Sequence, residues 1–141
     1  MSECLQASLV NRLDEIEKLA ARVDEFCRQN QIAAKDAYAI NVSLDELVTN
    51  VISYGYEDKA EHRIEIQLRM DNGWVEARID DDARAFNPME KPPPDLTKPL
   101  AERPIGGLGI HIVRKMMDSV SYRRQDGKNV LVLRKKVVAN S

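Results

Sequence analysis

Apolar residues recur along this chain with two periods, and each change of period marks a new element. The first set alternates with polar residues, as in a short strand: Leu5, Ala7 and Leu9. The next set recurs every three or four residues up to Asn30, as on one face of a helix: Leu13, Ile16, Ala20, Val23 and Cys27. The chain is therefore predicted to begin with a strand that is followed by a helix.

A second helix is predicted from about Ala34 to Tyr54. Its apolar positions again follow three- and four-residue steps: Ala37, Ile40, Leu44, Leu47 and Val51. Glu46 and Asn50 lie four residues apart and therefore share one face, beside that apolar stripe. The helix is predicted to end near Gly55, because glycine readily takes the left-handed conformation that closes many helices.

Strict alternation returns beyond this helix and predicts two antiparallel strands. The alternating residues are Ile64, Ile66, Leu68 and Met70 in the first strand and Val75, Ala77 and Ile79 in the second. Asp71-Asn72-Gly73 between them is a strong hairpin signal. By parity Asp81 falls on the buried side of the second strand, whereas Asp80 and Asp82 do not. A buried carboxylate needs a partner, and either a ligand or a local turn contact would supply one.

A long segment containing all six prolines follows the hairpin. These prolines lie between Pro88 and Pro104, so no regular element is predicted there, and residues 87–105 are interpreted as a flexible cover over a site. The segment ends in Gly106-Gly107-Leu108-Gly109 and leads directly into a helical pattern. A turn of this kind either cradles a phosphate with its free N–H groups or only makes a tight helix entry.

Size and composition favour one soluble domain, residues 1–141, which two further strands at about 119–124 and 130–133 complete. A net charge of -2 provides no broad basic field, so direct binding of nucleic acid is not expected. Cys4 and Cys27 form neither a disulfide framework nor a metal-ligand spacing, which favours a reducing compartment. The N-terminus has no signal-peptide core and no apolar run reaches transmembrane length, so a cytoplasmic location without membrane contact is predicted.

The pair Glu46 and Asn50 has the chemistry of a phosphoryl-transfer site. Asparagine offers a neutral oxygen ligand suited to a hard cation, and glutamate can accept a proton from an attacking hydroxyl. The same pair is common on solvated helix faces, so it is a weak signal by itself. Its weight comes from the order of features along the chain, in which the inward Asp81, the flexible segment and the glycine turn follow it. The chain has neither a P-loop nor the catalytic motifs of ordinary protein kinases.

In this order the features resemble the ATPase domain shared by gyrase, histidine kinases and MutL, the GHKL superfamily, and most closely its anti-sigma-factor serine-protein kinases. Residues 46–56, with Glu-Leu-Val-Thr-Asn and then Tyr-Gly-Tyr, are similar to the family's N box. Residues 81–88 resemble the next box, in which Ala83 and Asn87 replace the usual glycine and aspartate. Residues 106–113 resemble the last box, which ends the ATP lid. The resemblance spans nearly the whole chain.

This resemblance implies roles for individual residues. Glu46 would be the catalytic base, Asn50 would hold magnesium, and Asp81 would bind the amino group of adenine. Arg103, an always-charged fork in the lid, would either meet the γ-phosphate or pair with Glu102 at the surface. The implied ATP-binding set is Asn50, Asp81, Ala83, Phe86, Arg103, Gly106, Gly107, Leu108 and Gly109.

The implied fold is an α/β (α+β) two-layer sandwich of the Bergerat type, with helices on one face of a mixed, mainly antiparallel sheet. The implied function is that of an anti-sigma regulatory factor that uses ATP and Mg²⁺. It would bind a sigma factor in one state and phosphorylate a serine of a small STAS-type antagonist protein in another, and relatives of this kind are usually homodimers. The alternative is a nucleotide-gated partner-binding module without phosphotransfer, which Ala83 keeps open. His62 and His111 are interpreted as surface or packing residues.

Overall fold

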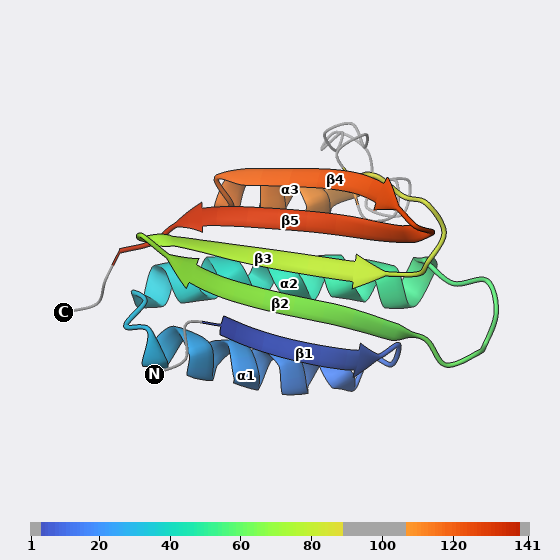
Figure 1. Ribbon diagram of the computed structural model, residues 1–141, viewed down its shortest axis with the longest axis horizontal. Coiled ribbons are helices and arrows are strands. Elements are labelled where there is room, and N and C mark those ends of the chain that lie inside the picture. The colour runs from blue at the N-terminus through green and yellow to red at the C-terminus, as the bar shows by residue number, and fades with distance from the viewer. Residues whose placement is uncertain (1–3, 89–106, 139–141) are drawn as a thin grey trace.

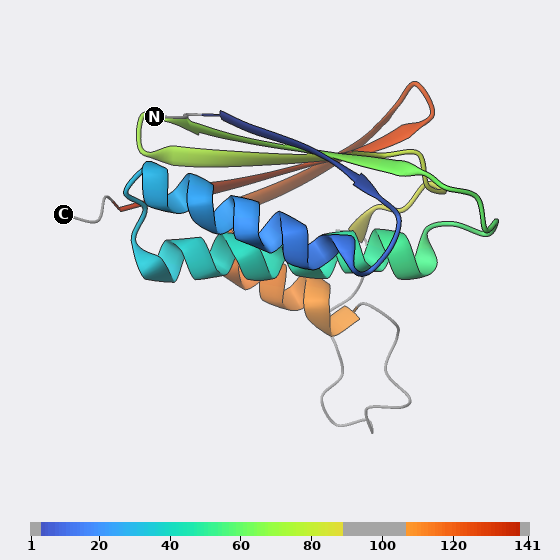
Figure 2. The same ribbon diagram turned by 90° about the horizontal axis from the view of Figure 1, so that it is seen from below.

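The computed structural model describes residues 4–88 and 107–138. Their elements follow in the order β1 (Cys4–Val10), α1 (Glu15–Gln29), α2 (Ala34–Tyr54), β2 (Arg63–Asp71), β3 (Trp74–Asp81), α3 (Gly107–Met116), β4 (Ser119–Gln125) and β5 (Lys128–Lys136). The strands form one sheet in the order β1-β2-β3-β5-β4, and all of its pairings are antiparallel. The helices lie together on one face of this sheet (Figure 1 and Figure 2). The predicted two-layer sandwich is thereby confirmed, but the sheet was predicted to be mixed and the described strands are antiparallel throughout.

The core lies between the sheet and the helices, where the alternating residues of the strands meet the apolar stripes of α1 and α2. In β2 and β3 the inward residues are almost completely buried: Ile64, Ile66, Leu68, Val75, Ala77 and Ile79. Ile66 pairs with Ile79 across the two strands, so this register places the whole set on the helix-facing side. The turn between the strands has positive φ angles at Asn72 (50°) and Gly73 (81°), as the predicted hairpin requires. No helix in residues 4–88 and 107–138 is long and apolar enough to cross a membrane.

Gly55 ends α2 at the predicted position, but its backbone conformation differs from the predicted one. Its φ of -84° and ψ of -23° are right-handed, so the prediction of a left-handed closing residue is wrong. Close packing explains the glycine instead, because a Cβ there would lie 2.6 Å from the carbonyl oxygen of Val51 and 2.8 Å from the Cβ of Ala83. The carbonyl of Gly55 also accepts the N–H of Arg84 at 3.1 Å. The end of α2 is thus fixed against the segment that follows β3.

Asp36 joins the beginning of α2 to the end of β5. This residue is only 4% exposed, and its Oδ2 accepts the N–H of Val138 at 2.9 Å. Its Oδ1 lies 4.0 Å from Nζ of Lys135, which also donates to the carbonyl of Met116 at 2.8 Å. One buried carboxylate therefore connects α2 with β5 and, through Lys135, with the end of α3.

Asp36→Ala is expected to lower the free energy of unfolding by about 2–3 kcal/mol, because the Val138 N–H loses its acceptor and the Lys135 ammonium loses its ion-pair partner. Urea unfolding at neutral pH measures this loss. Asp45→Ala is the matched control, since Asp45 lies exposed on the same helix and accepts the Thr49 hydroxyl at 3.0 Å. Its cost should stay within about 0.5 kcal/mol. Equal losses in the two variants would contradict the role given to Asp36.

Candidate functional site

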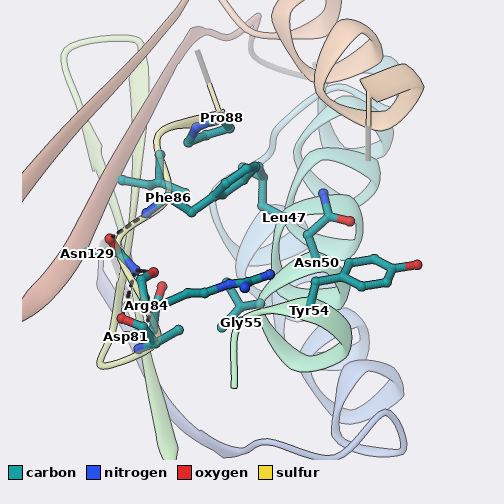
Figure 3. Close-up of a pocket in the computed structure, with 12 residues that line it drawn as sticks. Leu47, Asn50, Tyr54, Gly55, Asp81, Arg84, Phe86, Pro88 and Asn129 are labelled. Carbon is teal, nitrogen blue, oxygen red and sulfur yellow. Dashed lines mark hydrogen bonds between the residues drawn. The ribbon is translucent and has the colours of Figure 1, made fainter. Parts of the chain in front are cut away.

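A cavity of about 370 Å³ opens between the C-terminal half of α2 and the ends of β3 and β5. It is lined by Leu47, Asn50, Val51, Tyr54, Gly55, Asp81, Ala83, Arg84, Phe86, Pro88, Asn129 and Leu131. Figure 3 shows Asp81 and Asn129 on the sheet side of this cavity and Asn50 and Tyr54 on the α2 side. A mainly apolar wall with a few polar groups is typical of a site for a small organic ligand.

Asp81 ends β3 and faces the cavity, as parity predicts. It is 2% exposed, whereas Asp80 is half-buried and Asp82 is exposed. Its Oδ1 accepts the N–H of Ala83 at 3.1 Å and the side-chain amide of Asn129 at 2.9 Å, while no described residue donates a hydrogen bond to its Oδ2. Burial raises the pKa of Asp81, and the Asn129 and Ala83 hydrogen bonds oppose that increase. Asp81 thus makes the local turn contact and still presents an oxygen to the cavity.

Asn50 and Glu46 extend the site along α2 toward α3. Asn50 lines the cavity, and its Nδ2 is buried without a hydrogen-bond partner among the described residues. Glu46, one turn earlier, is half-buried and lies against Gly109 in the first turn of α3. A Cβ on Gly109 would overlap the carboxylate of Glu46 and lie 3.1 Å from its carboxyl carbon. The structure therefore brings Glu46 of the predicted pair into contact with Gly109 of the glycine turn, and Gly109 makes room for Glu46.

Ala83 and Phe86, two residues of the implied ATP-binding set, also line the cavity. Ala83 is buried, and its Cβ points toward the space that the absent side chain of Gly55 leaves open. The pair of small residues keeps α2 close to the segment after β3 even though Ala83 replaces a glycine. Phe86 is 39% exposed and stands with Pro88 at the other side of the cavity (Figure 3).

Part of the predicted site lies outside the described residues. This part comprises Arg103, Gly106 and residues 89–105 of the predicted lid. The predicted helix is present, but it begins earlier than expected: α3 starts at Gly107, so residues 107–109 of the predicted glycine turn already belong to the helix.

Asn129 is a site residue that the sequence interpretation missed. It lies on β5, is 4% exposed, and bonds directly to Asp81. A signal was present, because position 129 has the same parity as Leu131 and Leu133, which both face the core. The argument that identified Asp81 would therefore have identified Asn129 as well.

His62 is a packing residue, as predicted, and it connects the loop after α2 to the site. Its ring stacks on Tyr56, with centroids 4.1 Å apart. Its Nε2 lies 2.8 Å from Oδ1 of Asp58, and its Nδ1 lies 3.1 Å from Oδ2 of Asp82. The other oxygen of Asp82, Oδ1, accepts the Tyr56 hydroxyl at 3.1 Å. The hydrogen bonds to Asp58 and Asp82 raise the pKa of His62. Only the protonated ring can donate to both carboxylates.

Protein stability is expected to decrease as the pH rises through the raised pKa of His62. A histidine whose folded-state pKa is raised contributes fully below its unfolded pKa of about 6.5, and that contribution is lost above the folded pKa. Denaturant unfolding of the wild type and of His62→Gln at pH values from 5.5 to about 8.5 measures the difference. The stability advantage of the wild type should be largest at the acidic end of this range. A difference that does not change with pH would remove this role from His62.

The sequence of this chain is similar to a known family of domains. The sequence profile described as histidine kinase-like ATPase domain matches residues 9–135. Serine/threonine-protein kinase BtrW of Bordetella bronchiseptica is 26% identical over 111 residues, covering 79% of this chain and 78% of that protein. The anti-sigma F factor of Bacillus subtilis is 31% identical over 101 residues, covering 70% and 68%. Serine-protein kinase RsbW of Bacillus mycoides is 28% identical over 105 residues, and the match covers 71% of this chain and 64% of that kinase.

Solved structures agree on the fold. The RsbU and RsbW domains from Mycobacterium tuberculosis give a TM-score of 0.71 at 14% identity, over 96% of this chain and 33% of that one. A blue-light activated histidine kinase of Erythrobacter litoralis gives 0.58 at 14% identity, over 89% and 60%. The matched profile spans most of the sequence, including the cavity and the contact between Glu46 and Gly109. This chain therefore belongs to the histidine kinase-like ATPase domain family.

Proposed function

We propose that this protein is an anti-sigma factor with serine-protein kinase activity. It binds ATP with magnesium, phosphorylates a serine of a small STAS-type antagonist protein, and binds a sigma factor in another state. Relatives named serine-protein kinase and anti-sigma F factor support this class. The observation that carries the proposal is the buried Asp81, which presents an oxygen to an apolar cavity that Asn50 also lines.

The base of the nucleotide occupies this cavity in our proposal. The exocyclic amine of adenine donates to Oδ2 of Asp81, since Oδ1 already accepts two hydrogen bonds. Apolar side chains of α2 and β5, including Leu47 and Leu131, contact the faces of the ring. An adenine placed in this way directs its phosphates along α2 toward Glu46 and the first turn of α3.

The residues around Asn50 fit a magnesium nucleotide. Nδ2 of Asn50 has no hydrogen-bond partner among the described residues, and Asn50 lines the cavity, so its NH₂ group is available to a ligand. Asn50 would hold the ion through its amide oxygen, and magnesium would neutralise charge on the phosphates. Glu46 accepts the proton of the serine hydroxyl as that oxygen bonds to the γ-phosphorus and the bond to ADP breaks. Gly109 keeps Glu46 in place, because a side chain there would displace its carboxylate.

Asn50→Ala is expected to weaken ATP binding about tenfold in the presence of magnesium and to reduce the gain in affinity that magnesium provides. Calorimetric titration with and without the ion measures both effects. Asn41→Ala is the control, because Asn41 lies on the same helix and donates to Asp24 at 2.6 Å, away from the cavity. A full magnesium effect in Asn50→Ala would assign the ion to other residues.

Two measurements test the proposed function. ATP with magnesium should raise the unfolding temperature, since a ligand at a hundredfold excess over its dissociation constant adds about 2.7 kcal/mol to the free energy of unfolding. Transfer of labelled γ-phosphate to an antagonist protein should then follow. Stabilisation without transfer would favour the nucleotide-gated binding module, and the absence of stabilisation would overturn both functions. A cytoplasmic location and a homodimer belong to the same proposal, and the mass of the protein in solution tests the latter.

A further inference from the structure

Asn129 lies beside the turn between β4 and β5, and its side chain points toward Asp81 (Figure 3). Its Nδ2 donates to Oδ1 of Asp81 at 2.9 Å and to the carbonyl of Arg84 at 2.9 Å, with a longer contact of 3.4 Å to the carbonyl of Ala83. All three acceptors belong to residues that line the cavity. One amide group therefore holds both the carboxylate and the backbone of this wall.

Three donors fix the orientation of that amide from the other side. Its Oδ1 accepts the hydroxyl of Tyr122 at 2.6 Å, Nη1 of Arg124 at 3.1 Å and the N–H of Phe86 at 3.4 Å. Arg124 also donates to the carbonyl of Ala83 at 2.8 Å. Because donors surround the oxygen and acceptors surround the nitrogen, only one of the two amide orientations satisfies this network.

We propose that Asn129 is the positioning residue for base recognition: it engages one oxygen of Asp81 and leaves the other oxygen to select a nucleobase that carries an exocyclic amine. This inference rests on the proposed nucleotide function and adds a residue to it. Asn129 acts through Asp81, so its loss affects the choice of base more than the binding of phosphates. The β4–β5 hairpin thereby takes part in base selection.

The charges around Asp81 show why a neutral donor at position 129 matters. Asp82 lies beside Asp81 on the chain, Tyr56 faces it from the loop after α2, and Arg124 faces it from β4. Burial and the Asp82 charge both favour the protonated form of Asp81, while the Asn129 hydrogen bond favours the carboxylate. If Asp81 were protonated, one of its oxygens would carry a hydrogen and act as a donor. The carboxyl group would then prefer a base with an exocyclic amine less strongly.

Asn129→Asp tests the inference with almost no change in shape. The variant replaces a donor by a second carboxylate that faces Asp81 and the carbonyl of Arg84. Calorimetric titrations with ATP and with inosine triphosphate, which has a carbonyl in place of the amine, give the base selectivity as a ratio of dissociation constants. We expect the wild type to prefer ATP by about tenfold to a hundredfold, the effect of one hydrogen bond to a charged group. In Asn129→Asp at pH 8.5 the preference should fall below about threefold.

The pH dependence supplies a second readout. Two adjacent carboxylates share one proton as the pH falls, and the shared proton restores a donor between positions 129 and 81. The preference of Asn129→Asp for ATP over inosine triphosphate is divided by that of the wild type at the same pH. This ratio should therefore rise as the pH is lowered from 8.5 to about 6. Asn41→Asp is the matched control, because Asn41 also donates to an aspartate, Asp24, but outside the cavity.

The possible results separate the inference from the proposed function. Equal weakening of ATP and inosine triphosphate in Asn129→Asp, with the wild-type preference retained, would show a merely structural role and overturn the inference alone. A wild type that binds neither nucleotide would overturn the proposed function as well. If Asn129→Asp does not fold, Asn129→Ser replaces it, since the shorter side chain cannot reach Asp81 and the Arg84 carbonyl together. A retained ATP preference in that variant would equally overturn the inference.

Discussion

Replacing Glu46 with glutamine is expected to reduce phosphoryl transfer by about 10²- to 10⁴-fold, the usual contribution of a general base. Glutamine has nearly the same shape, so it fits the space that Gly109 leaves open, but it cannot take up a proton. The affinity for ATP should stay within about threefold of the wild type, because Glu46 does not line the cavity that receives the base. Single-turnover transfer of labelled γ-phosphate to an antagonist protein, together with calorimetry, measures both quantities.

Asp45→Asn is the control for this experiment. Asp45 precedes Glu46 on α2 but lies exposed, and it accepts the hydroxyl of Thr49. The same change from carboxylate to amide should leave transfer unaffected there. If Glu46→Gln transfers phosphate at the wild-type rate, the assignment of the base is wrong.

Asp81→Asn is expected to weaken ATP binding by about tenfold to a hundredfold. The N–H of Ala83 and the amide of Asn129 both donate to the position of Oδ1, so the new amide must place its oxygen there. Its NH₂ group then takes the position of Oδ2 and faces the exocyclic amine of adenine, donor against donor. The loss should be much smaller for inosine triphosphate, which presents a carbonyl at that point.

Asp80→Asn provides the comparison for Asp81→Asn in the same titration. Asp80 is the preceding residue, but it pairs with Arg78 and does not line the cavity. Its ATP affinity should match that of the wild type. An unchanged affinity in Asp81→Asn would remove Asp81 from the recognition of adenine.

Periodicity alone predicted most of the fold, because long amphipathic elements leave a clear pattern. The bounds predicted for the second helix, Ala34 and Tyr54, agree with the structure. The hairpin at Asn72 and Gly73 is also confirmed. Parity along β3 placed Asp81 inward without any tertiary information, since successive strand residues must point to opposite faces.

Other features depend on contacts between distant segments, and periodicity does not report these. The contact between Glu46 and Gly109 requires α3 to pack beside α2, so the sequence predicted each feature separately but not their contact. Gly55 was expected to provide a left-handed closure, yet its role is close packing against Ala83, 28 residues further along the chain. Asn129 was missed because the last strand was predicted to begin only at residue 130, whereas it begins at Lys128, and the parity of position 129 is inward.

A crystal structure of the protein with ATP and magnesium would test the central claim most directly. The account predicts that adenine lies in the cavity between α2 and the ends of β3 and β5. Its exocyclic amine should donate to Oδ2 of Asp81 at about 3 Å, while Oδ1 keeps its hydrogen bond to Asn129. A nucleotide bound elsewhere, or an adenine whose amine faces solvent instead of Asp81, would contradict the account.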